Sequence, residues 1–191
     1  SGSGKSVTSR AIIGILASNA VHEKGAINYY DEEALVAKSE DRYVDLMAIK
    51  EEEFHKLRGT KISMIFQDPM SSLDPIMRVG KQITETLILK LKMDKESAKK
   101  RAIELMREVG IPEPEKRYYQ YPFQFSGGMR QRIVIAIALA NDAEILICDE
   151  PTTALDVTIQ AQILELINRI KIERNLSVIF ITHDLGVVAN M

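Results

Sequence analysis

The sequence is poor in cysteine, in net charge and in long apolar runs, and each shortage excludes a class of protein. One cysteine, Cys148, rules out an internal disulfide or a cysteine metal cluster within this chain. A formal net charge of −2 leaves no electrostatic footprint for nucleic acid. No apolar run approaches the roughly 20 residues of a membrane-spanning helix, and no secretory signal is visible.

What is present fits one ordinary globular domain. The 191 residues are 46% apolar and 27% charged, with no repeat and no low-complexity linker. The chain opens with Ser1 and not with methionine, so we expect its natural start to lie upstream. The mixed charges of residues 95–101 predict the solvated face of a helix.

Apolar segments at helical and strand spacing predict an α/β fold with a mostly parallel sheet. Residues 144–149 and 177–182 are continuous apolar runs, typical of strands buried on both faces, and residues 159–174 form the helix that crosses between them. Cys148 is then a small buried hydrophobe on the first of these strands. Other expected elements are helices at residues 6–19 and 51–57, strands at 26–30 and 62–66, and a polar loop or hairpin at 31–45.

The middle of the chain is helical. Residues 79–92, 95–110 and 127–141 carry helical periodicity, and Gly110 with Pro112 ends the second of these helices. We interpret residues 76–140 as a helical subdomain inserted into an α/β core made by residues 1–75 and 141–191 of a single domain.

The first residues carry half of a phosphate-binding motif. The segment Gly2-Ser3-Gly4-Lys5-Ser6 matches the end of the pattern G-x-x-x-x-G-K-[ST]. In that motif glycines expose backbone N–H groups to phosphate oxygens, the lysine reaches the β- and γ-phosphates, and the hydroxyl binds Mg²⁺. By itself the segment could also be a flexible glycine-rich terminus with an exposed lysine.

Two acids follow the apolar run at residues 144–148. Asp149 can hold Mg²⁺, because hard cations take oxygen ligands. Glu150 points the other way, since side chains alternate along a strand, and can polarise the attacking water. The alternative is a pair of acids that starts a turn before Pro151; a phosphate loop in the same chain favours the catalytic interpretation.

A third motif begins at Ser126, Gly127 and Gly128, where a serine and two glycines at a helix start make an anion cradle. Alone they could be an N-cap and two permissive glycines. The segment from Phe125 to Arg132 resembles the signature motif of the ABC ATPase family. The resemblance implies the ABC ATPase fold, with ATP and Mg²⁺ as cofactors and two ATP molecules held between two head-to-tail domains. The signature of one domain then binds the γ-phosphate of the other.

Other positions acquire roles through the same resemblance. Gln67 matches the Q-loop glutamine, which contacts Mg²⁺ and the attacking water and senses the membrane partner. Asp156, after Ala154-Leu155, matches the D-loop that crosses the dimer interface, and His183 matches the switch histidine at the γ-phosphate. His22 and His55 match nothing, and we expect both at the surface.

Residues 66–75, 127–132 and 149–156 are similar to ATP-binding subunits of bacterial and archaeal oligopeptide/dipeptide permeases. This implies peptide import, a peripheral place on the cytoplasmic face of the cell membrane, transmembrane permease subunits, a second ABC ATPase subunit and, indirectly, an extracytoplasmic solute-binding protein. Two features depart from the group: Phe125 stands where leucine is usual, and residues 31–45 are longer than the usual hairpin.

Three other interpretations each meet an objection or leave a consequence in the sequence. A DNA-acting ABC ATPase needs a long coiled-coil insertion, but only 59 positions separate Gln67 from Ser126. A regulatory module with a dead site conflicts with the intact motif residues. A fragment without the first strands and the adenine-stacking aromatic residue would bind nucleotide poorly.

Overall fold

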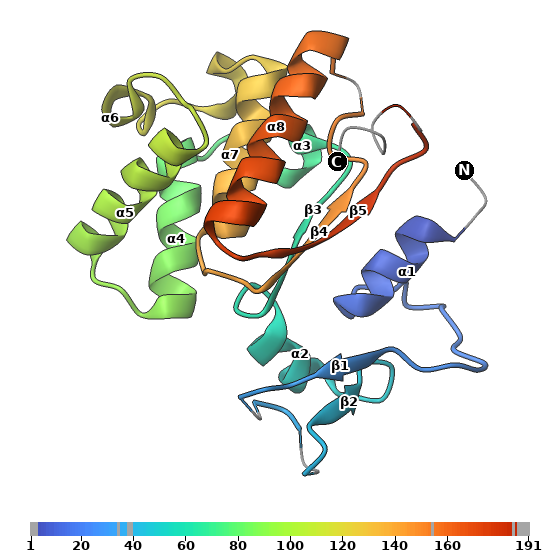
Figure 1. Ribbon diagram of the computed structural model, residues 1–191. Helices are drawn as coiled ribbons and strands as arrows, with labels where there is room; N and C mark the ends of the chain where they lie inside the picture. The colour runs from blue at the N-terminus through green and yellow to red at the C-terminus, as the bar shows by residue number, and fades with distance from the viewer. Residues whose placement is uncertain (1–3, 34, 38–39, 154, 185, 187–191) are drawn as a thin grey trace.

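A three-stranded parallel sheet forms the centre of the molecule (Figure 1). The computed structural model describes residues 4–33, 35–37, 40–153, 155–184 and 186. The strands lie in the order β3 (Ile62–Ile65), β4 (Ile145–Asp149) and β5 (Ser177–Ile181). Helix α8 (Val157–Glu173) makes the crossover from β4 to β5 that parallel pairing requires. The carboxyl ends of all three strands therefore meet at one edge, and the expected parallel sheet is confirmed.

The two faces of the sheet pack against different layers. Leu146 and Cys148 of β4 lie in the core shared with the helices, whereas Ile147 between them lies in the core shared with the N-terminal elements. This alternation is the two-residue period of a strand. All three side chains are at most 2% exposed, so β4 is buried on both faces, as predicted.

Helices cover one face of the sheet. They are α3 (Pro69–Ser72), α4 (Val79–Leu91), α5 (Lys95–Glu108), α6 (Pro114–Arg117), the 3₁₀ turn η1 (Pro122–Gln124), α7 (Gly127–Leu139) and α8. Asp94 caps α5 by accepting hydrogen bonds from the amides of Glu96 and Ser97. The three long helices expected here are present, ending one or two residues early, and Gly110 has the positive φ of +78° that stops α5. The subdomain boundaries at residues 76 and 140 stay a prediction.

The other face carries an antiparallel hairpin and two helices. Strand β1 (Asn28–Tyr30) pairs with β2 (Tyr43–Asp45), beside α1 (Lys5–Ile12) and α2 (Glu51–Leu57). Between the strands, Asp31 Oδ2 accepts hydrogen bonds from the backbone N–H groups of Val36 and Ala37 at 2.7 and 2.8 Å. A hairpin at residues 31–45 was one of the two expected forms.

Helix α1 was predicted to reach residue 19, and that prediction is wrong. It ends at Ile12, and Gly14 follows with a φ of +68°. A Cβ on Gly14 would lie 2.5 Å from the Phe54 ring, so only glycine fits under α2. Arg58 donates to the carbonyl oxygens of Ile13 and Gly14, which caps the turn. Tertiary contacts from α2, and not local propensity, set this helix end.

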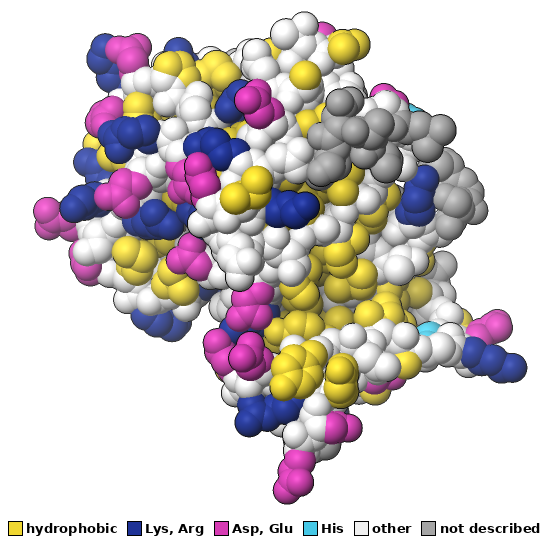
Figure 2. Space-filling model, in the orientation of Figure 1, with side chains coloured by type: hydrophobic (Ala, Val, Ile, Leu, Met, Phe, Trp, Pro, Cys, Tyr) yellow, Lys and Arg dark blue, Asp and Glu magenta, His cyan; other side chains and the backbone are white. Residues whose placement is uncertain are grey.

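Strand β5 is less buried than its apolar sequence predicted. Ile179 is 41% exposed, because among the described strands β5 pairs with β4 alone. In the view of Figure 2, apolar side chains gather in the middle of the molecule, between the helices and the β1–β2 hairpin. No described helix combines the length and apolar character needed to cross a membrane.

Candidate active site

The start of α1 lies against the carboxyl ends of β4 and β5. Ser6 Oγ donates a hydrogen bond to Asp149 Oδ1 at 3.0 Å, and Lys5 Nζ donates to the carbonyl oxygen of Thr182 at 3.4 Å. Gly4 precedes the helix with a φ of +73°, a conformation that favours glycine. The half motif and the two acids, far apart in sequence, thus meet in space. Gly2 and Ser3, also predicted to bind phosphate, lie outside the described residues.

Glu150 stands at the centre of a second set of contacts, with Gln67, Thr153 and His183, which we call the Glu150 cluster. Its Oε2 accepts hydrogen bonds from Gln67 Nε2 at 3.0 Å and from Thr153 Oγ1 at 3.1 Å, and its Oε1 lies 3.2 Å from His183 Nδ1. The backbone of Glu150 has a φ of +50°, and its amide donates to the carbonyl of Ile181 at 2.9 Å. This left-handed turn directs the carboxylate across the ends of all three strands.

Thr153 belongs to this cluster although the sequence predicts no role for it. Its hydroxyl reaches Glu150 because the chain turns back after Pro151, with the amide of Thr153 bonded to the carbonyl of Glu150 at 3.1 Å. A hydroxyl three residues after a strand-end acid, with a proline between them, was the available signal.

The environment keeps Glu150 ionised. Burial raises the pKa of this carboxyl, but hydrogen bonds from His183 and Thr153 and the charges of His183 and Lys5 outweigh burial, so its pKa is lowered overall. A carboxylate that stays charged at neutral pH can accept a proton from water. His183 is 64% exposed at its side chain, so one side of this cluster faces solvent.

Ser6 and Asp149 are suited to Mg²⁺. Both present hard oxygen atoms, they already lie within 3.0 Å of each other, and Asp149 is 4% exposed. Mg²⁺ is commonly held by one or two carboxylates together with substrate phosphates and water, so a larger acidic cluster is unnecessary. Gln67, the third expected ligand, has its amide nitrogen on Glu150, and its role as a magnesium ligand stays a prediction.

The signature residues form a separate group. Ser126 caps α7 and accepts from the amide of Met129 at 3.3 Å, and Asp156 caps α8 and accepts from the amide of Ile159 at 3.0 Å. Gly128 packs against Ile159, so the two helices begin side by side. Neither cap residue shares a hydrogen bond or ion pair with any described residue of the Glu150 cluster. The described contacts of Ser126 and Asp156 are therefore separate from those of Glu150.

Gly128 and Gly127 offer a direct test of this helix contact. A Cβ at Gly128 would lie 2.6 Å from Ile159 Cγ2, whereas a Cβ at Gly127 would lie 3.5 Å from Leu155 Cδ2, an ordinary contact. We expect Gly128→Ala to lower the free energy of unfolding by about 1–3 kcal/mol through overpacking. Gly127→Ala is the matched control and should melt near the wild-type temperature. Equal thermal midpoints for the two variants would contradict the packing.

A cavity of about 930 Å³ opens beside Ser6 and Asp149. Ser6, Gln67 and Asp149 form part of its wall, and Thr86 of α4 and Asn141 after α7 also line it. Lys5, Glu150 and His183 do not line it. Gln67 therefore contacts the Glu150 cluster and this cavity at once.

Comparison with known proteins identifies the family. A family model described as "ABC transporter" matches residues 1–153. The chain belongs to the ABC transporter ATP-binding family. This confirms the resemblance drawn from residues 125–132.

The relatives share high identity. The chain is 55% identical over 191 residues to "Oligopeptide transport ATP-binding protein OppD" of Bacillus subtilis, which covers 100% of the chain and 50% of the relative. It is 56% identical over 190 residues to "Dipeptide transport ATP-binding protein DppD" of Lactococcus lactis subsp. cremoris, covering 99% and 51%. The chain thus spans about half the length of the curated relatives it matches.

Solved structures confirm the ABC ATPase fold. The ATP-binding cassette MJ0796, described as a dimer in a post-hydrolysis state bound to ADP and Pi, gives a TM-score of 0.67 at 32% identity, over 77% of this chain and 62% of that chain. CbiO1 from Clostridium perfringens, described as part of the ABC transporter complex cbiONQ, gives 0.74 at 25% identity, over 98% and 66%.

Proposed function

We propose that the chain binds and hydrolyses ATP to energise import of oligopeptides or dipeptides. The observation that carries the proposal is the Glu150 carboxylate, held by Gln67, Thr153 and His183 beside the Ser6–Asp149 pair. A base, a phosphate-binding lysine and a pair of oxygen ligands at the carboxyl edge of a parallel sheet are the parts that phosphoryl transfer from a nucleotide needs.

In this site Lys5 and the N–H groups at the start of α1 bind the β- and γ-phosphates. Ser6 and Asp149 would hold Mg²⁺, which would neutralise charge on the phosphate oxygens. Glu150 takes a proton from water as the water oxygen bonds to the γ-phosphorus, while the bond from that phosphorus to the β–γ bridging oxygen breaks. Gln67 orients the water, and His183 contacts the transferred phosphate. The products are ADP and inorganic phosphate.

A second copy of the domain completes each site. Ser126, Gly127 and Gly128 lie apart from the Glu150 cluster in one chain, and a head-to-tail partner would bring its own signature to the γ-phosphate. Asp156 starts the neighbouring helix and would lie at the same interface. The dimeric description of MJ0796 supports this arrangement. Hydrolysis then waits for association, and ATP favours the closed dimer because it binds that state more tightly.

The partners follow from the relatives' names, which describe transport of oligopeptides and dipeptides. The chain would act at the cytoplasmic face of the membrane with permease subunits, a paired ATPase subunit and, indirectly, a solute-binding protein. Because Gln67 lines the 930 Å³ cavity and also donates to Glu150, a partner group entering the cavity would disturb a hydrogen bond to the base.

Peptide uptake tests the transport proposal. Cells that lack their own ATPase subunit of a peptide permease are supplied with the gene for this protein, and entry of a radiolabelled peptide is measured. We expect uptake with the wild-type protein and none with Lys5→Ala. Uptake of nickel but not of peptide, with the same dependence on Lys5, would leave the ATPase in place and overturn the substrate class.

A further inference from the structure

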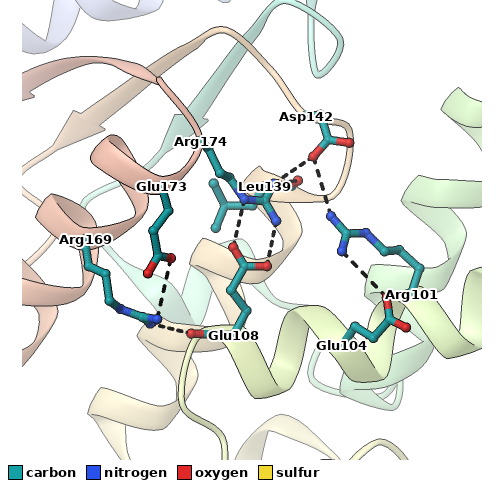
Figure 3. A network of polar contacts seen from close by, with 8 residues as sticks. All are labelled: Arg101, Glu104, Glu108, Leu139, Asp142, Arg169, Glu173 and Arg174. Atoms are coloured by element: carbon teal, nitrogen blue, oxygen red, sulfur yellow. Dashed lines mark hydrogen bonds and ion pairs between the residues drawn. The ribbon is translucent and has the colours of Figure 1, made fainter.

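One arginine joins the carboxyl-terminal ends of three helices. Arg174, at the end of α8, donates from Nε and Nη2 to Glu108 Oε1 and Oε2 of α5 at 2.8 and 2.7 Å (Figure 3). Its Nη1 donates to the carbonyl of Leu139, the last residue of α7, at 3.0 Å and to Asp142 at 2.7 Å. All its nitrogen atoms thus have partners on elements far apart in sequence.

Two other arginines, Arg101 and Arg169, join the same network. We call the following residues the Arg174 cluster: Arg101, Glu108, Asp142, Arg169 and Arg174. Arg169 donates to the carbonyl of Glu108 at 2.6 Å, and Arg101 lies 3.6 Å from Asp142 (Figure 3). The last carbonyls of a helix have no partner within the helix and carry partial negative charge. Arginines from α8 therefore cap the ends of both α5 and α7.

The cluster differs from an ordinary surface ion pair. The side chains of Arg174 and Glu108 are 17% and 22% exposed and meet in a two-bond fork. By contrast, Arg107 of α5 pairs with Glu115 of α6, and these side chains are 57% and 60% exposed. Exposed pairs of that kind contribute little to stability, whereas a forked, partly buried arginine fixes a geometry.

The position of the cluster links it to the signature. Helices α7 and α8 run parallel and side by side, with Gly128 against Ile159 at their starts and the Leu139 carbonyl bonded to Arg174 at their ends (Figure 1). Their starts carry Ser126 and Asp156, the residues that the proposed function places at the dimer interface.

Because α7 is long, a small tilt at its carboxyl-terminal end displaces its amino-terminal end. The 13 residues of α7 make a rod about 20 Å long. A tilt of about 3° at the Leu139 end would move the Ser126 end by about 1 Å, a displacement that can cost a hundredfold in rate at a catalytic site. A small loss of order at the Arg174 cluster would therefore displace Ser126 and the glycines that follow it.

We propose that Arg174 is a positioning residue that holds α7 and α8 in one orientation and so sets the place of Ser126–Gly128 relative to Asp156. Its effect on turnover rests on the proposed function, but its effect on geometry does not. Arg174 touches no reacting group, and it acts through the helix it caps.

A distance measurement tests the geometry without nucleotide. Spin labels are placed on cysteines introduced at Phe123 and Val157, which are 72% and 83% exposed near the two helix starts. Cys148 is buried and stays unlabelled. Adding Arg174→Met, which keeps the apolar stem, should broaden the distance distribution. Arg107→Met is the matched control and should leave it as in the labelled parent.

Glu108→Gln is the second variant, because it leaves the capping bonds to Leu139 intact, and it covers the case in which Arg174→Met does not fold. It should broaden the same distribution to a smaller extent. Unchanged distributions in every folded variant of the pair would overturn the proposal.

Turnover gives the second readout. We expect Arg174→Met to lower kcat by about tenfold while KM for ATP stays at the wild-type value, since Lys5 and Ser6 are untouched. A rise in KM with unchanged kcat would overturn the positioning role. If even the wild-type protein hydrolyses no ATP, the proposed function fails, and the distance result alone decides the role of Arg174.

Discussion

Replacing Glu150 with glutamine is expected to stop ATP hydrolysis while ATP binding persists. Glutamine matches glutamate in size, still accepts a hydrogen bond, and tolerates the φ of +50° as glutamate does. It cannot take a proton from water, and general-base catalysis contributes roughly 10²–10⁴ in rate. Lys5, Ser6 and Asp149 are unaltered, so nucleotide affinity should remain. The measurement is phosphate release beside equilibrium binding of a fluorescent ATP analogue.

The same variant should also accumulate as an ATP-bound dimer, because reopening follows hydrolysis in the proposed cycle. Size-exclusion chromatography with ATP and Mg²⁺ detects the dimer. Glu165→Gln is the matched control: it makes the same chemical change on an exposed position of α8 and should behave as wild type. Undiminished phosphate release by Glu150→Gln would remove Glu150 from the role of base.

The part of the site that could be predicted is the part that follows from strand order. Gln67 follows β3, Asp149 and Glu150 end or follow β4, and His183 follows β5. Parallel strands bring their carboxyl ends to one edge, so acids and amides after such strands converge whatever their distance in sequence. The apolar runs were long enough to place these strands, and the structure brings the predicted residues together.

The features that escaped prediction depend on neighbours that a local pattern does not contain. The end of α1 is set by Phe54 and Arg58, which approach from α2. The exposure of Ile179 depends on which strands lie beside β5. The local sequence around Arg174 and Glu108 predicts only polar residues at helix ends. The two residues are 66 positions apart, and only the structure shows that they form a pair joined by two hydrogen bonds.

Because the proposed site is shared between two chains, mixing two inactive variants tests it. If each site takes Lys5 from one chain and Ser126 from the other, Lys5→Ala disables both sites of a homodimer. Ser126→Arg does the same by filling the phosphate cradle with a large side chain. Neither variant alone should associate with ATP or release phosphate above background.

A mixture of the two variants should recover what each has lost. In a mixed dimer one site combines both defects, and the other pairs an intact Lys5 with an intact Ser126. Random pairing makes about half of the dimers mixed, each with one working site, so about a quarter of the wild-type rate is expected if the sites act independently. Coupled sites would lower that rate but would leave ATP-driven association in the mixture. If that association is absent, the two halves do not meet across a head-to-tail interface, and the separation of Ser126 from Glu150 in one chain needs a different explanation.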